Sequence, residues 1–235
     1  MPDPFTSTQG DLAPHWNTLM SELAPHLRPL ASKVALLPTS VGDQIIASFR
    51  GEAVRRAIRH QGAPMPVVPF RDIGGIWIVW LGYREVWVPS THVSRFTFSS
   101  SDLTIFFSMA HGEAFQQILR AEWAGPVRDN DGWSFRPSNA GHPHWQIDAI
   151  QVLREDAEHQ AARELLQEAT PKEFGGIETV PLPEPPWYDI ARMHLASAMR
   201  PWIDGLIAHG PPGLASIRAW VVNTVSLLDT ELARL

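Results

Sequence analysis

The sequence predicts an α+β fold: a central, mostly antiparallel sheet flanked by N-terminal and C-terminal helices. Near both ends of the chain, apolar residues recur at intervals of three and four, as in helices that bury one face. Between these ends, short runs of β-branched and aromatic residues are separated by turn residues, a pattern typical of an antiparallel meander. Helices, then strands, then helices again indicate an α+β protein.

The N-terminal part is expected to be helical after a flexible, proline-rich lead-in over residues 1–10. The apolar spacing over 11–35 predicts a helix, whose second half is broken or kinked by Pro25 and Pro29. A second helix is expected over 42–61, followed by a glycine that ends it.

The central part is expected to form short strands separated by turns. The expected strands are 76–81, 85–88, 93–99, 103–108, 133–136 and 144–152. The expected turns are Gly82-Tyr83, Pro89-Ser90, 100–102 and 129–132. One helix, over 112–123, interrupts these strands. In the first strand Trp77 and Trp80 point to opposite faces. Either both faces of the sheet are therefore covered, or one tryptophan lies on an exposed binding surface.

The C-terminal part is again expected to be helical, and the whole chain, 1–235, is expected to form one domain. A helix over 155–169, a proline-rich connector over 170–187 and a kinked helix over 188–208 precede the final helix over 211–235. That last helix has an unbroken apolar stripe, which we expect to pack on the domain or to mediate self-association or binding of a protein partner.

Composition and charge exclude several classes of protein. The chain of 235 residues is 44% hydrophobic, which excludes bulk disorder, and its lack of cysteine excludes disulfides and thiolate metal sites. The longest apolar run, 73–82, is too short to span a membrane, and the N-terminus lacks the pattern of a signal peptide. The net charge of −6 does not favour nucleic-acid binding. We therefore expect a soluble, cytoplasmic protein.

Arginine is used far more often than lysine. Of the 19 basic residues, only Lys33 and Lys172 are lysines. This usage is typical of a GC-rich bacterial genome. The alternative is that some of the arginines recognise phosphate or carboxylate groups, which their planar forks bind with two hydrogen bonds.

The densest group of reactive side chains lies in the segment 139–148. If 142–148 is extended, alternate residues share one face of the strand. That face then carries four polar residues, with Asn139 in the loop before them: His142, His144, Gln146 and Asp148.

This polar face has three interpretations. His142 and His144, two apart on a strand, can bind one divalent metal ion, with Asp148 completing or orienting the site. Alternatively, the same three residues supply a general base and its orienting partner without a metal. In the third interpretation the face is only solvated, and Trp145 and Ile147 anchor the strand to the core.

A second candidate is the basic segment 55–60. Arg55 and His60, with four residues between them, have a spacing that is similar to the ribonuclease motif of the HEPN superfamily. The resemblance implies that Arg55 stabilises phosphate charge and that His60 does acid–base work. The sequence departs from the motif at Arg56, where that motif usually has a small polar residue or histidine, and the superfamily is a helical bundle. The alternative is a solvated basic face.

Two functional hypotheses follow. The first is a binding or accessory component of a bacterial protein complex, with a polar surface on the strand that contains His144. The second is a hydrolase, directed at phosphodiesters and with or without a metal, that uses His142, His144 and Asp148. The first is favoured because the sequence contains no complete catalytic constellation.

Overall fold

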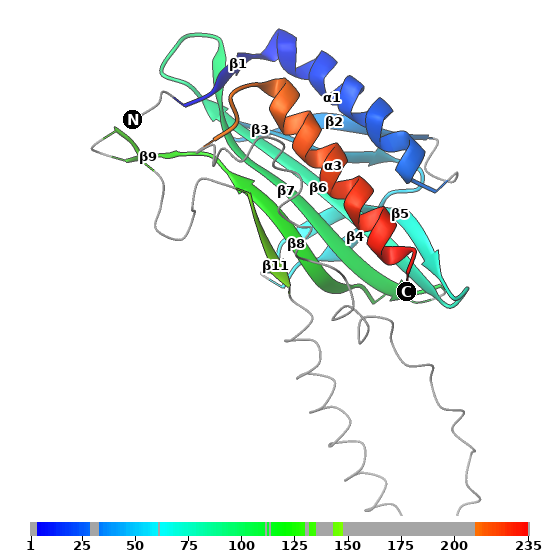
Figure 1. The fold of residues 1–235 in the computed structure, drawn as a ribbon. Helices are drawn as coiled ribbons and strands as arrows, with labels where there is room; N and C mark the ends of the chain where they lie inside the picture. The colour runs from blue at the N-terminus through cyan, green and yellow to red at the C-terminus, as the bar shows by residue number, and fades with distance from the viewer. Residues whose placement is uncertain are drawn as a thin grey trace, which may run out of the picture.

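The computed structural model describes residues 4–28, 33–60, 62–110, 112, 114–129, 132–134, 143–147 and 210–234. These residues form a nine-stranded antiparallel sheet, a small two-stranded hairpin and two long helices, so the fold class is α+β as predicted (Figure 1). The helices expected over 155–169 and 188–208 and the connector over 170–187 lie outside the described residues.

The large sheet is built around two long neighbouring strands, β6 and β7. Its strands are β1 (Thr6–Thr8), β2 (Val34–Val41), β3 (Gln44–Gly51), β4 (Arg55–Ile58), β5 (Pro64–Ile73), β6 (Trp77–Pro89), β7 (Arg95–Met109), β8 (Gln116–Ala124) and β11 (His144–Ile147). The main order is β11-β8-β7-β6-β3-β2, and β1 pairs with β7. β9 (Val127–Asp129) and β10 (Gly132–Ser134) pair antiparallel and form the hairpin.

One edge of β6 has two partners in succession. Residues 84–87 of β6 pair with β3, whereas residues 77–82 pair with β5, which in turn pairs with β4. β3 and β5 therefore separate from each other along β6. This split positions the pocket described below.

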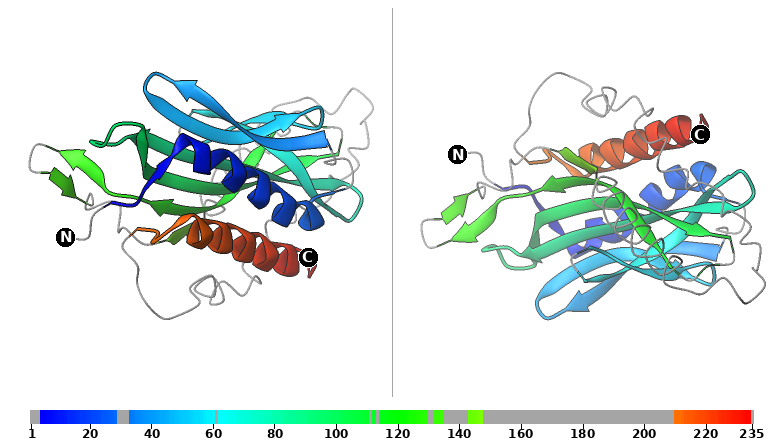
Figure 2. Two further views of the ribbon diagram at one scale, coloured as in Figure 1. Left: turned by 90° about the horizontal axis from the view of Figure 1, so that it is seen from above. Right: turned by 90° about the horizontal axis from the view of Figure 1, so that it is seen from below.

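Both helices lie on the same face of the sheet and run in the same direction (Figures 1 and 2). α1 (Gln9–Leu23) begins after Thr8, whose side-chain oxygen accepts a hydrogen bond from the amide of Asp11. It ends before Pro25, in a 3₁₀ turn over Ala24–His26. α3 (Leu214–Leu232) confirms the predicted C-terminal helix and lies against α1.

Apolar side chains are buried on both faces of the sheet. The main core lies between sheet and helices, and a second cluster forms on the outer face, the face away from α1 and α3. That second cluster contains Ala57, Met65, Val67, Trp80 and Phe106. Trp77 packs against the main core and Trp80 belongs to the outer cluster, so the two tryptophans point to opposite faces as predicted. Trp80 is buried, which excludes it as an exposed binding surface.

Two predicted helices are wrong. Residues expected in the helix over 42–61 form β3 and β4, and those expected over 112–123 belong mainly to β8. In β3, Ile45, Ala47 and Phe49 alternate toward the main core, a period of two that the helical interpretation overlooked. When a segment contains many apolar residues, they fit the spacing of a helix as well as the alternation of a strand. Pairing with neighbouring strands then decides which of the two forms.

Two predicted turns are also wrong, because β6 continues through Gly82-Tyr83 and β7 through residues 100–102. Gly82 serves packing here: a Cβ atom on it would come within 2.8 Å of the Met65 sulfur. The expected lead-in is ordered from residue 4, since Thr6–Thr8 form β1. Within the described residues, neither helix is long and apolar enough to cross a membrane.

Candidate functional site

A pocket lined by four arginines lies on the outer face of the sheet, where β3 and β5 separate. Its volume is about 280 Å³. The arginines are Arg50 on β3, Arg56 on β4, Arg59 just after β4, and Arg84 on β6. Arg84 pairs in register with Ser48 of β3 and alternates with the core-facing Tyr83, which places it on the outer face. Four cations from three segments, β3, β4 with the residue after it, and β6, thus converge on one pocket.

The charge in this pocket is only partly balanced. None of the described lining residues is acidic. The guanidinium of Arg50 donates to the hydroxyl of Thr39 at 3.0 Å. Arg59 is buried and reaches two carboxylates behind the pocket, while its Nε–H is buried without a hydrogen-bond partner among the described residues. An unsatisfied buried donor is costly, so Arg59 is not fully satisfied by its two carboxylate partners.

The two carboxylates behind Arg59 form a pair. Asp102 of β7 lies opposite Glu122 of β8 in the sheet register. Burial, together with the negative charge of Glu122, raises the pKa of Asp102 to about 6. Burial also opposes the charge of Glu122, but hydrogen bonds from His144 and Asp102 and the positive charge of Arg120 outweigh it and lower the pKa of Glu122. Below about pH 6 the pair therefore holds one proton, carried by Asp102.

β11 brings two of the predicted site residues to this pair. In the register His144 lies opposite Glu122, and Gln146 lies opposite Arg120. The Nε2 atom of His144 is 3.3 Å from Glu122 Oε2, and Arg120 donates to the side-chain oxygen of Gln146. Trp145, between them in sequence, packs against the main core. The strand thus alternates as expected over its described residues.

The other predicted residues of this segment, the binding residue Asn139 and the metal or catalytic residues His142 and Asp148, lie outside the described residues. The proposed metal pair of His142 and His144 is therefore not described as a pair. Within the part of the chain that the structure describes, no three His, Asp or Glu side chains are grouped as metal ligands.

Arg55 and His60 do not occupy a helix, so that expectation is wrong. Arg55 lies on β4, with its guanidinium 5.6 Å from the ring centre of Trp80. His60 follows β4, and its backbone N–H and ring Nε2–H donate to the side-chain and backbone oxygens of Gln117, each at 3.2 Å. These contacts tie β4 to the outer cluster and to β8. The helical setting that the HEPN resemblance implies is absent from this segment.

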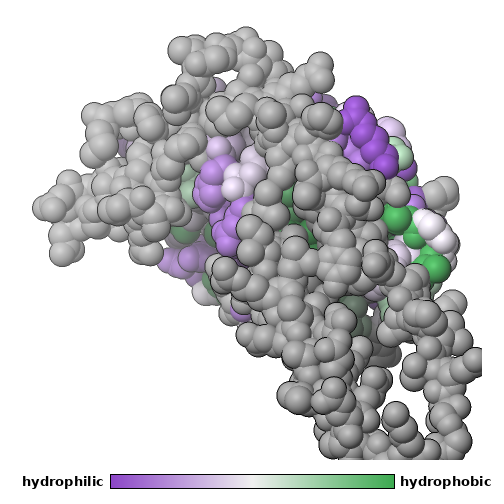
Figure 3. Space-filling view, turned by 60° about the horizontal axis from the view of Figure 1, so that its bottom comes forward, coloured by the Kyte–Doolittle hydropathy of each residue, from purple (hydrophilic) through white to green (hydrophobic). Residues whose placement is uncertain are grey.

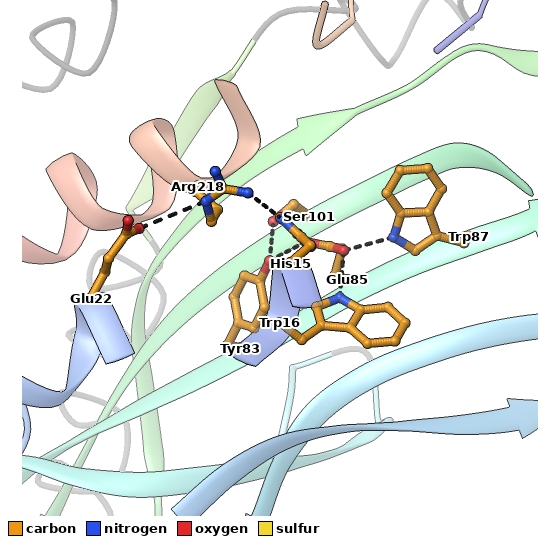
Figure 4. Close-up of polar contacts among 8 residues, drawn as sticks. All are labelled: His15, Trp16, Glu22, Tyr83, Glu85, Trp87, Ser101 and Arg218. Atoms are coloured by element: carbon orange, nitrogen blue, oxygen red, sulfur yellow. Dashed lines mark hydrogen bonds and ion pairs between the residues drawn. The ribbon is translucent and has the colours of Figure 1, made fainter. Parts of the chain in front are cut away.

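A second polar centre lies on the opposite face, under the helices (Figure 4). Glu85 of β6 is fully buried, and each of its oxygens receives two contacts. Oε1 accepts from the indoles of Trp16 and Trp87, each at 2.7 Å. Oε2 accepts from the Tyr83 hydroxyl at 2.5 Å and lies 3.0 Å from His15 Nε2. A carboxylate with four donors stays charged inside the core.

The pKa values in this centre follow from its hydrogen bonds. Burial opposes the charge of Glu85, but the hydrogen bonds from His15, Tyr83 and Trp87 outweigh it and lower its pKa. Burial and the charge of Glu85 raise the pKa of Tyr83 well above its usual value. Tyr83 therefore stays protonated as a donor, and its oxygen accepts from Ser101 at 3.2 Å.

His15 connects this buried centre to a second pocket, of about 450 Å³, between α1, β1 and the first turn of α3. Its other ring nitrogen, Nδ1, lies 3.4 Å from Arg218 of α3. Arg95, Asp11 and Thr18 also line this pocket.

The sequence interpretation missed His15 and Glu85, although both leave a signal. His15 lies between Leu12 and Leu19 on the apolar stripe of α1, and Glu85 shares a strand face with Tyr83 and Trp87. A charged residue on a buried stripe indicates a polar centre.

No protein-family model, curated protein or solved structure matches the chain, so these sites are interpreted from their own geometry.

Proposed function

We propose that the chain is a binding component of a protein complex and that the arginine pocket on the outer sheet face holds an acidic segment of the partner. The observation that carries the proposal is the convergence of Arg50, Arg56, Arg59 and Arg84 on a pocket without an acidic residue among its described lining. Arginine forks bind carboxylates with paired, charge-assisted hydrogen bonds. This local charge contrasts with the net charge of −6 for the whole chain.

The surroundings of the pocket favour a protein partner over a nucleic acid. Val41 lines the pocket and is 55% exposed, and Ile58 on the neighbouring β4 is 58% exposed. In the view of Figure 3, the visible described residues lie in separate small areas, in which hydrophilic and hydrophobic residues are neighbours. Arginine combined with apolar side chains is typical of protein interfaces, whereas nucleic-acid interfaces are more uniformly basic.

The experiment measures binding of a fluorescein-labelled hexaglutamate peptide by anisotropy. We expect Arg84→Gln and Arg56→Gln each to weaken binding. The matched control is Arg234→Gln, which removes the same charge from an arginine that pairs with Glu231 at the end of α3. Equal affinities in all three variants would contradict the proposal. If a labelled single-stranded oligonucleotide binds more tightly than the peptide, the ligand of the pocket is a nucleic acid and not an acidic protein segment.

A second candidate function is a hydrolase, favoured by the paired carboxyl groups of Asp102 and Glu122 next to His144, which hold one proton below about pH 6. One protonated and one charged carboxyl group can serve as general acid and general base. The test is hydrolysis of bis(p-nitrophenyl) phosphate by the wild type and by Glu122→Gln. Activity that is lost in the variant while the fold is kept would support this candidate, and no activity in the wild type would reject it for this substrate class.

A further inference from the structure

We infer that the pocket between α1, β1 and α3 is a second ligand site, which binds a small anion that also carries a hydroxyl group, such as hydrogen phosphate or a hydroxy acid. His15 and Arg218 are the residues that recognise the ligand, and Arg95 adds positive charge on the pocket wall. The site lies on the helix side of the sheet and does not depend on the proposed function of the arginine pocket.

The contacts of His15 define which ring nitrogen carries its hydrogen. Arginine has donors only, so in its 3.4 Å contact with Arg218 Nη1 the Nδ1 atom is placed as an acceptor. The ring hydrogen is therefore on Nε2 and is donated to Glu85 at 3.0 Å. With Nε2 facing Glu85, the other ring nitrogen of His15, Nδ1, lies next to Arg218.

The buried centre holds this imidazole in place. The side chain of His15 is fully buried, and Glu85 is itself fixed by Trp16, Trp87 and Tyr83 (Figure 4). A histidine whose far nitrogen donates to a carboxylate has a fixed orientation and tautomer, the arrangement found where a histidine accepts a proton or hydrogen bond from a ligand. The geometry therefore fixes Nδ1 beside the pocket, where its present contact is the long one to Arg218.

Arg218 supplies the anion-binding part. Its contacts are long, 3.4 Å to His15 and 4.0 Å to Glu22, and its side chain is 25% exposed. An anion would make shorter, charge-assisted hydrogen bonds with the guanidinium. On the other wall Arg95 is held through two nitrogens by Thr6, and Asp11 is the single acidic residue among the described lining. Among the described lining residues, two arginines thus face one carboxylate.

These two parts together define the ligand. Charged oxygens of the anion bind Arg218 and draw its N–H away from His15 Nδ1, whose single lone pair then accepts a hydrogen bond from a hydroxyl group on the same molecule. A simple carboxylate such as acetate has no hydroxyl at neutral pH and satisfies only the arginine. Inorganic phosphate and glycolate satisfy both residues, so the site is expected to prefer them to acetate.

The test is an NMR titration with inorganic phosphate, glycolate and acetate. The reporters are the indole N–H signals of Trp16 and Trp87, since both indoles donate to Glu85. We expect phosphate and glycolate to shift these signals at lower concentrations than acetate does. Arg218→Gln should weaken phosphate binding about tenfold or more, the effect of losing a charged hydrogen bond. The control Arg84→Gln changes the arginine pocket and should leave the titration unchanged.

A second variant separates the roles of His15 and Arg218. His15→Gln keeps an amide donor for Glu85 but removes the imidazole acceptor, so it should bind phosphate and acetate with similar affinity. If this variant does not fold, Arg218→Gln decides the question because its side chain is partly exposed. No signal shift in the wild type, or an undiminished shift in Arg218→Gln, would overturn the inference.

Discussion

The carboxylate of Glu85 accepts a hydrogen bond at 2.7 Å from the indole of Trp16, a residue 69 positions away in the sequence. This contact joins α1 to β6 in the middle of the core. A charge buried in this way stabilises the fold only while its donors remain in place, because an unpaired buried charge or donor is costly. The polar centre therefore fixes the position of α1 on the sheet.

Replacing Glu85 with leucine should lower the free energy of unfolding by about 3 kcal/mol or more, because four donors lose their acceptor. Urea unfolding followed by tryptophan fluorescence measures the change. The control is Glu52→Leu, which removes an exposed partner of Lys33 and should stay within about 0.5 kcal/mol of the wild type. Similar losses in both variants would show that the centre adds no stability.

Asp102 should make stability depend on pH. Its folded pKa of about 6 lies above its ordinary value of 3.8, so folding favours the protonated form. This contribution is fully present below the unfolded pKa and is lost as the pH rises through about 6. Asp102→Asn mimics the protonated group and lacks that loss. Between about pH 4 and pH 7, the free energy of unfolding of the variant should therefore rise by on the order of 2 kcal/mol relative to that of the wild type. A stability difference that is constant over this range would contradict the account.

The buried face of α3 should not tolerate charge. Val221 is fully buried in the main core, so Val221→Asp should cost several kcal/mol, about the effect of an uncompensated charge in a core. Ala219→Asp, two residues earlier on the exposed side, should cost only about 1 kcal/mol or less, the difference in helix propensity. Thermal unfolding compares the two variants. Equal melting temperatures would mean that α3 contributes little to the core.

The two faces of β11 should respond differently to truncation. Trp145 packs against the main core, so Trp145→Ala should cost about 3 kcal/mol. His144 is half-buried, and its described ion pair is with Glu122, so His144→Ala should cost about 1 kcal/mol or less. Chemical denaturation of both variants checks this order. A larger loss for His144→Ala would assign this residue a mainly structural role.

The elements that could be predicted from the sequence are those whose apolar residues recur with a single period, that of a helix or that of a strand. α1 and α3 have apolar stripes with helical spacing, and β11 alternates between His144, Trp145 and Gln146. The segments around Ile45 and Leu119 are apolar at both periods, and they become strands because β6 and β7 offer edges for pairing. This information lies in distant residues and not in the local pattern.

The candidate sites depend even more on long-range contacts. The arginine pocket exists because β3 and β5 share one edge of β6, which brings Arg50, Arg56 and Arg84 together. The role of Glu85 could not be predicted because the sequence indicates a turn at Gly82-Tyr83. Such a turn would separate Tyr83 from Glu85 and Trp87. In the structure β6 is continuous, so these three residues share one face of the strand. The buried carboxylate of Glu85 accepts hydrogen bonds from Tyr83 and Trp87 on either side of it.

The most direct test of the proposed function compares two double variants by calorimetric titration with hexaglutamate peptide. Arg56→Gln/Arg84→Gln removes two cations from the pocket, whereas Arg28→Gln/Arg234→Gln removes two cations that pair elsewhere with Asp72 and Glu231. The account predicts that the pocket variant loses about a hundredfold in affinity, roughly tenfold for each charged hydrogen bond, while the control stays close to the wild type. Equal losses in both double variants would contradict it, because binding would then follow net charge and not the pocket.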